Sequence, residues 1–187
     1  MGSVGSIPEE EMVLRISASL AYKKSVYDRY LAKGYIRDTD PFIIALNRSG
    51  VTMLPDPLLP LVVKCCFGVG DLTLSIPVRD KPGPREKGKS FWSGRMALKK
   101  RSGSDVSMLF FEDSSNRGIS AVMYSVDSII NSPMHPQTTG ENICIIHNPN
   151  ATNPIPINFF TFGEERKAKE DFLHIIRRRK KWRKSFF

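Results

Sequence analysis

Residues 117–156 read RGISAVMYSVDSIINSPMHPQTTGENICIIHNPNATNPIP, and this stretch decides the fold. Two apolar runs stand in it, at 119–125 and 143–147. Short apolar runs that are bounded by turn residues are typical of strands buried on both faces. The second run leads directly into a turn rich in Asn and Pro. We therefore expect two buried strands, the second of which feeds a polar turn of the kind that often holds a working site.

Upstream of this stretch, residues 9–34 predict one long amphipathic helix. Three carboxylates at 9–11 suit a first helical turn, because they face the positive end of the helix dipole. Gly34 is a typical helix end. Apolar residues recur between these limits at helical spacing, namely Val13, Ile16, Leu20, Tyr27 and Leu31.

The remaining elements are predicted from shorter patterns. A strand is expected at 42–46, after Pro41, and a turn at 47–50. A short helix is expected at 58–67, begun after Asp56 with Pro57 at its first position and ended by Gly68. Further strands are expected at 71–78 and 108–111, and loops at 79–105 and 131–140, the first of them mobile with Phe91-Trp92 as a local anchor. Helical spacing returns at 164–176, through Ala168, Phe172, Ile175 and Ile176.

This order of elements predicts an α/β (mixed α+β) fold. We expect a central mixed sheet of four to five strands, flanked by the long N-terminal helix and by a C-terminal helix. A chain of 187 residues suits one domain with a single core. The predicted organisation is a flexible lead at 1–8, one domain at 9–176 and a basic tail at 177–187.

Positive charge is concentrated in two segments of the chain. The formal net charge is +9. Residues 79–101 hold nine Lys/Arg and two acidic residues, and residues 164–184 hold ten Lys/Arg and four acidic residues. The rest of the chain is therefore mildly acidic. Basic segments favour polyanions such as nucleic acid or anionic lipid, although solubility alone can also account for them.

The three cysteines, Cys65, Cys66 and Cys144, predict a reduced, cytoplasmic protein. Adjacent cysteines rarely pair with each other, and an odd number leaves one over. The apolar run at 58–63 is interrupted by Pro60 and stopped by Lys64, so it is too short to cross a bilayer. We expect no cofactor, and Mg²⁺ only for the nuclease alternative described below.

For each candidate catalytic residue, a structural role explains the sequence pattern better than catalysis or metal binding. Cys144 and His147 have the separation of metal ligands, but residues three apart on a strand point to opposite faces. No Gly-x-Ser-x-Gly sequence surrounds Ser120 or Ser125, and an apolar run makes a thiol inert. The pair Glu165 and Lys167 has the spacing of a metal-dependent nuclease. In a predicted helix, however, positions two apart diverge, so we expect salt bridges on a solvated face.

Two candidate binding sites remain. The polar turn after the second apolar run predicts a cleft at the sheet edge, lined by His147, Asn148, Asn150 and Asn153. The stronger signal is a set of cations that can neutralise phosphates, with an indole that can stack on a base. This predicted nucleic-acid-binding set comprises Lys99, Lys100 and Arg101 of the basic loop, and Arg177, Arg178, Arg179, Lys180, Lys181, Trp182, Arg183 and Lys184 of the tail.

The order of these blocks resembles the C-terminal part of an uncharacterised, mostly bacterial protein family related to restriction-endonuclease-like (PD-(D/E)XK) proteins. The matching pieces span about two thirds of the chain, and each is short. They are the helix through Tyr30, the strand at 41–47, Phe67-Gly68, Phe91-Trp92, the strand at 119–125, and His147-Asn148-Pro149 with Ala151 and Pro154.

The resemblance implies a nuclease-like scaffold without its catalytic half. In longer relatives an acidic, Lys-containing strand region would precede the helix that starts here near Glu9. That strand region would then be absent from this chain, lost, or supplied by a partner chain that completes the domain. No catalytic residue is therefore carried over. We therefore expect a nucleic-acid-binding protein that does not cleave alone. The alternatives are a metal-dependent nuclease and an interaction or anionic-membrane-surface protein, and we do not expect a membrane partner.

Overall fold

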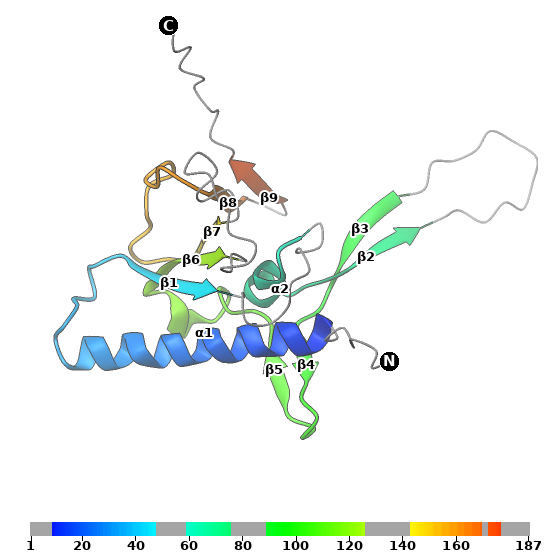
Figure 1. Ribbon diagram of the computed structural model, residues 1–187, viewed down its shortest axis with the longest axis horizontal. Coiled ribbons are helices and arrows are strands. Elements are labelled where there is room, and N and C mark those ends of the chain that lie inside the picture. The colour runs from blue at the N-terminus through cyan, green and yellow to red at the C-terminus, as the bar shows by residue number, and fades with distance from the viewer. Residues whose placement is uncertain (1–8, 48–58, 76–88, 126–142, 170–171, 177–187) are drawn as a thin grey trace, which may run out of the picture.

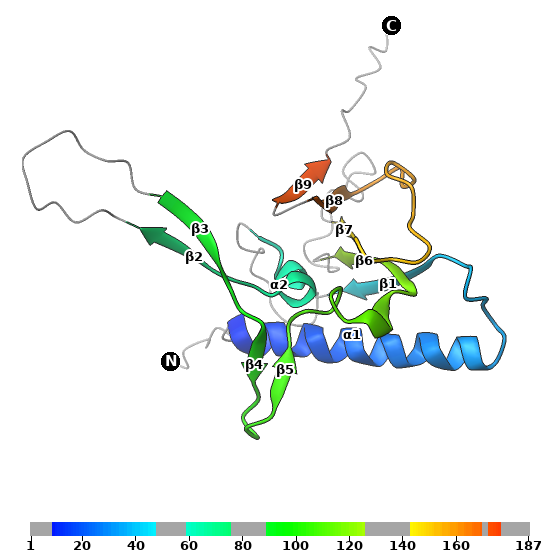
Figure 2. The ribbon, with the colours of Figure 1, turned by 180° about the vertical axis from the view of Figure 1, so that it is seen from behind.

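The computed structural model describes residues 9–47, 59–75, 89–125, 143–169 and 172–176 (Figure 1). Within them one five-stranded sheet forms the centre, and two helices pack against it. Two small two-stranded sheets extend from the body near the N-terminal end of the first helix (Figures 1 and 2). The predicted mixed α/β architecture is thereby confirmed, with five strands in the main sheet.

Helix α1 spans Glu9–Ala32. Its buried side chains are Val13, Ile16, Ser17, Leu20 and Tyr27, which lie along one stripe of the helix. Gly34 follows with a φ of 68°, the left-handed conformation that commonly ends a helix. The predicted helix, its apolar stripe and its glycine end are therefore confirmed.

The main sheet has the strand order β1-β6-β7-β8-β9. Its strands are β1 (Phe42–Asn47), β6 (Ile119–Ser125), β7 (Ile143–His147), β8 (Glu164–Lys169) and β9 (Phe172–Ile176). Strands β1 and β6 are parallel, as are β7 and β8, whereas β6–β7 and β8–β9 are antiparallel. The apolar runs at 119–125 and 143–147 thus form neighbouring central strands, which is why both are buried on two faces.

Each face of the sheet is covered by a different layer. One face meets α1 and α2, where Ile44, Val122, Tyr124 and Ile146 join a cluster with the helix side chains. The other face is covered by the segment that follows β7, which contributes Ile155 and Phe160 against Ala121 and Ile145. The polar turn after β7 therefore lies at the start of a segment that closes a second, smaller core.

Helix α2 spans Leu61–Phe67 and is almost wholly buried. It begins after Pro60, not after Asp56 as predicted, because Pro60 itself takes an extended conformation with a ψ of 134°. Gly68 ends the helix with a φ of 65°, as expected. Its backbone N–H donates to Lys64 O and to Met108 O, so this glycine also fastens α2 to the chain that enters the second half of the molecule.

Two hairpins replace most of the basic loop predicted at 79–105. Strand β2 (Val69–Ser75) pairs with β3 (Lys89–Gly94), and β4 (Ala97–Lys99) pairs with β5 (Asp105–Ser107). The strand expected at 71–78 is confirmed as far as Ser75, whereas the loop prediction was wrong for β3, for β4 and for the first residue of β5. The strand expected at 108–111 was also wrong, because β5 ends at Ser107. The tip of the first hairpin, residues 48–50 of the turn expected at 47–50 and the loop expected at 131–140 lie outside the described residues. Asn47, expected in that turn, is the last residue of β1.

The C-terminal helix predicted at 164–176 is wrong, because this segment forms the hairpin β8–β9. Residues 165 and 167 project from one face of β8, and residues 164, 166 and 168 from the other. The edge of β7 offers backbone donors and acceptors that pair with β8 from Cys144–Glu164 to His147–Lys167. This pairing overrides the helical propensity of Glu, Arg, Lys and Ala.

Candidate nucleic-acid interface

The polar turn after β7 is anchored to the protein interior through Asn148. Asn148 is 4% exposed, and its side-chain amide donates to Asn116 O and to Ile119 O, at 3.3 and 2.8 Å. Its carbonyl oxygen accepts the N–H of Asn150, whose own amide donates to Phe111 O at 3.0 Å. These amides join β6, the turn and the segment before β6, so their hydrogen-bonding capacity serves the fold.

His147 also faces inward. Its Nε2 lies 3.0 Å from Oε2 of Glu165, and both side chains are almost fully buried. The same carboxylate oxygen accepts the N–H of Asn158 at 3.0 Å, and Asn158 has a φ of 65°. Glu165 thus holds together the end of β7, the start of β8 and the intervening segment. The expected salt bridge on a solvated helix face is wrong for Glu165.

Glu165 and Lys167 lie on a strand and not on the predicted helix. On β8 these residues point to the same face, in contrast to the divergence expected in a helix. Lys167 is exposed, whereas Glu165 is 4% exposed and engaged by two donors. Among the residues that the structure describes, no group of three or more His, Cys, Asp or Glu side chains is placed to hold a metal ion.

The candidate nucleophiles have structural contacts. Ser120 donates to Asn153 O at 2.6 Å and accepts the N–H of Phe42 at 3.0 Å, so its hydroxyl fastens β1 to β6 and to the polar turn. All three cysteines are buried, and none of them forms a disulfide with another. Cys144 faces α1 and α2, on the side of the sheet opposite to His147, as the strand argument predicted.

Burial makes the helix α2 thiols unreactive. It raises the pKa of Cys65 to about 12 and that of Cys66 well above its ordinary value. Because a raised thiol pKa leaves almost no thiolate at pH 8, we expect neither cysteine to react with a disulfide reagent in the folded protein. Denaturation in urea should expose both. Rapid labelling of Cys65 or Cys66 in the native state, located by mass spectrometry, would contradict this packing.

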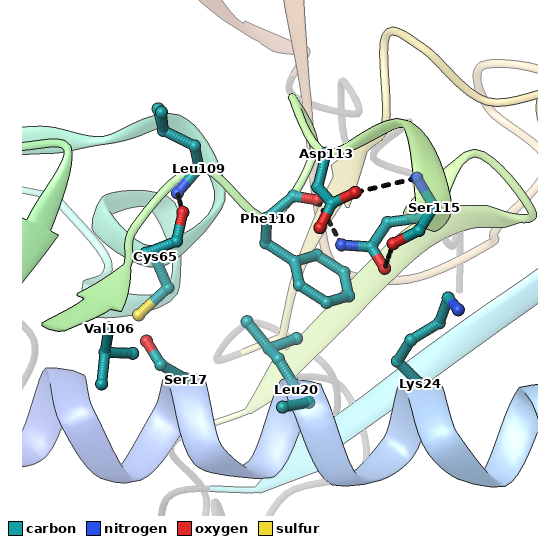
Figure 3. Close-up of a pocket in the computed structure, with 12 residues that line it drawn as sticks. Ser17, Leu20, Lys24, Cys65, Val106, Leu109, Phe110, Asp113 and Ser115 are labelled. Carbon is teal, nitrogen blue, oxygen red and sulfur yellow. Dashed lines mark hydrogen bonds between the residues drawn. The ribbon is translucent and has the colours of Figure 1, made fainter. Parts of the chain in front are cut away.

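A pocket of about 320 Å³ lies between α1 and the segment that follows β5 (Figure 3). Ser17, Leu20 and Lys24 face it from α1, and Phe110, Asp113 and Ser115 face them from the other side. The backbone N–H of Ser115 donates to Asp113 and lowers the pKa of that carboxyl. None of the residues predicted to line a cleft reaches this pocket. No motif in the sequence marked it, because its lining comes from segments far apart in the chain.

The β4–β5 hairpin presents the predicted cations Lys99, Lys100 and Arg101. Leu98 is buried in the main core opposite Val106, so the alternating side chain of Lys99 points outward. Lys100 and Ser104 close the turn by a hydrogen bond, and Gly103 adopts a φ of 88°, which suits a three-residue hairpin turn. The three cations are therefore held at the tip of a hairpin by the packing of its base.

The charge at this tip is only partly compensated. Arg101 lies 3.7 Å from Glu11 of α1, and its side chain is 96% exposed. Lys99 lies opposite Asp105 in the hairpin, and both are exposed. An ion pair this exposed contributes little to stability, so its cation can readily exchange the carboxylate for another anion. The tip is therefore a small cationic surface that can meet phosphate groups.

The β2–β3 hairpin is fixed at its base by a charged cluster of Glu9, Glu10, Lys64, Asp71 and Arg95. Lys64 is 6% exposed and its ammonium contacts Glu9 and, at 3.2 Å, Asp71. Arg95 bridges Asp71 at 2.7 Å and Glu10 at 3.1 Å. This cluster joins the first turn of α1 to α2, to β2 and to the residue directly after β3, so it sets the direction in which the hairpin projects.

The hairpin also exposes large apolar side chains. Phe91 and Trp92 are 52% and 38% exposed. Of the expected local anchor, Trp92 lies beside the buried Lys64, whereas Phe91 is the more exposed of the two. Leu72 and Leu74 are exposed on the partner strand. The predicted tail residues Arg177–Lys184, including Trp182, lie outside the described residues, so their role stays a prediction.

Comparisons of the chain with models of protein families, with curated proteins and with solved structures gave no match. The relationship to restriction-endonuclease-like proteins therefore stays a prediction. None of the helices in the described part of the chain is long and apolar enough to cross a membrane.

Proposed function

We propose that this protein binds nucleic acid through the cations at the tip of the β4–β5 hairpin. The observation that carries the proposal is the exposure of Lys99, Lys100 and Arg101 together on one projecting turn. Lysine and arginine side chains that reach phosphates release condensed counterions, which is the main source of sequence-independent affinity for nucleic acid. The interior hydrogen bonds of the polar turn favour this hairpin over the cleft predicted after β7.

The proposal extends to the C-terminal tail by sequence alone. Arg177, Arg178, Arg179, Lys180, Lys181, Arg183 and Lys184 would add phosphate contacts, and Trp182 would add base stacking. Such a surface positions a nucleic acid without cleaving it. Cleavage, if a partner chain completes the domain, would then depend on that partner.

Titration of the full-length protein against labelled nucleic acids at several salt concentrations tests the proposal. A duplex DNA, a single-stranded DNA and an RNA of equal length serve as probes, and vesicles with and without anionic lipid serve as a comparison. We expect binding at low salt, and we expect log K to fall linearly as log salt rises. Absence of binding at low salt, or salt-independent binding, would overturn the proposal. Preferential binding to anionic vesicles would assign the cations to a lipid surface instead.

A further inference from the structure

Strand β3 presents two faces of different chemistry. Lys89, Phe91 and Ser93 alternate with Ser90, Trp92 and Gly94 along the strand, so the two sets point in opposite directions. Register places Thr73 opposite Phe91 and Ser75 opposite Lys89. One face of the hairpin therefore combines an aromatic ring with a cation and hydroxyl groups.

The opposite face of the same hairpin is apolar. Leu72 lies opposite Trp92, and Leu74 lies opposite Ser90. The Trp92 ring has a partner within the fold, because the Lys64 ammonium lies 5.9 Å from its centre. Among the described residues, no such contact with a cation is formed by the Phe91 ring. Phe91 is also more exposed than Trp92. Packing within the fold therefore accounts for Trp92 better than for Phe91.

The surroundings of Phe91 fit a nucleotide. The hairpin projects away from the body in both views, so its faces are accessible from solvent (Figures 1 and 2). Lys89 stands two residues from Phe91 on the same face, about 7 Å along the strand. In the other direction the chain runs from Gly94 through Arg95 and Met96 directly into β4. Along the chain, the Phe91 ring thus lies between Lys89 and the cationic tip of the β4–β5 hairpin.

We propose that Phe91 stacks on an unpaired base and that the preferred ligand is a single-stranded nucleic acid. Lys89 contacts its backbone beside the stacked base, and Lys99, Lys100 and Arg101 contact it further along. This inference rests on the proposed nucleic-acid binding and adds the class of ligand. A single strand offers unstacked base faces to an aromatic ring, whereas a duplex must first be unstacked at an energetic cost.

Binding of the full-length protein to three probes tests this inference. The probes are a deoxythymidine oligomer of roughly 15 nucleotides, an abasic oligomer of the same length and a duplex. The oligomer and its abasic form carry the same phosphates, so their difference in affinity reports base contacts alone. We expect the deoxythymidine oligomer to bind most tightly.

Substitution of Phe91 should remove this difference. Phe91→Ala should weaken binding of the deoxythymidine oligomer by about 5- to 100-fold and leave the abasic oligomer unaffected. Phe91→Leu keeps an apolar side chain without the ring and should lose the same preference. Phe159→Ala is the matched control, because Phe159 is 65% exposed on a different segment. It should bind all three probes like the unmodified protein.

Three outcomes would overturn the inference. They are unchanged binding of the deoxythymidine oligomer by Phe91→Ala, an equal loss for the abasic oligomer, and a larger loss in Trp92→Ala than in Phe91→Ala. In each case salt-dependent binding by the unmodified protein would leave the proposed function standing. Failure of the unmodified protein to bind any probe would instead remove the proposed function itself.

Discussion

Replacement of Glu165 by alanine is expected to lower the free energy of unfolding by about 2–4 kcal/mol, because it leaves buried His147 without its partner and the Asn158 N–H without its acceptor. The carboxylate joins three parts of the chain, namely the end of β7, the start of β8 and the segment between them. Glu165→Gln retains the shape and one acceptor oxygen, so its loss should be smaller. Urea unfolding followed by circular dichroism gives the midpoints.

The matched control is Lys167→Ala on the same face of β8. Lys167 is exposed, so its removal should change the free energy of unfolding by less than about 0.5 kcal/mol. Equal stability of the two alanine variants would contradict the buried His147–Glu165 contact. If Glu165→Ala instead abolished Mg²⁺-dependent cleavage of a plasmid at unchanged stability, the nuclease alternative would replace the structural role assigned here.

The centre of the fold follows from the sequence because its signals are strong and local. The apolar runs at 119–125 and 143–147 are buried on both faces, so nearly every residue in them is apolar. Helix α1 combines acidic residues in its first turn with a regular apolar stripe and a glycine at its end. In these elements the local preference and the burial pattern indicate the same structure.

The hairpin β8–β9 could not be predicted in this way. Its residues EERKAK favour a helix by intrinsic propensity, and the strand forms only because β7 offers an unpaired edge. A signal that points to the hairpin is Gly163, whose φ of 78° places it in a turn directly before β8. A β-carbon on Gly163 would lie 2.9 Å from Ile143 O, so this glycine also permits the close approach of the chain to β7.

The β2–β3 hairpin was predicted only in part. The strand expected at 71–78 overlaps β2, whereas β3 was placed in a loop because the segment at 79–105 is rich in Gly, Pro and basic residues.

The polar turn after β7 was ambiguous in the sequence. Asn148 and Asn150 are the residues that either a ligand site or a tight turn would use, and only their hydrogen bonds to Asn116, Ile119 and Phe111 distinguish the two.

A second large effect is expected at the β4–β5 hairpin. Replacing Lys99, Lys100 and Arg101 together by glutamine removes the three proposed phosphate contacts and leaves Leu98, which packs the base of the hairpin, unchanged. We expect a loss of affinity for single-stranded DNA of about 10- to 100-fold at low salt. The tip is exposed, so the thermal unfolding midpoint should stay close to that of the unmodified protein.

A control variant must carry the same change of charge elsewhere. Two exposed cations of helix α1 and a third directly after its end serve this purpose, because their replacement by glutamine lowers the net charge equally. This α1 variant should bind almost as tightly as the unmodified protein if the contact lies at the hairpin. The three substitutions are Lys23→Gln, Arg29→Gln and Lys33→Gln.

The dependence of single-strand affinity on salt, measured for these two variants beside the unmodified protein, tests the central claim most directly. Each phosphate contact with a single strand adds about 0.7 to the slope of log K against log salt. The hairpin variant, which lacks three such contacts, is therefore expected to have a slope shallower by about 2, and the α1 variant a slope close to that of the unmodified protein. Equal slopes for both variants would contradict nucleic-acid binding by the β4–β5 hairpin.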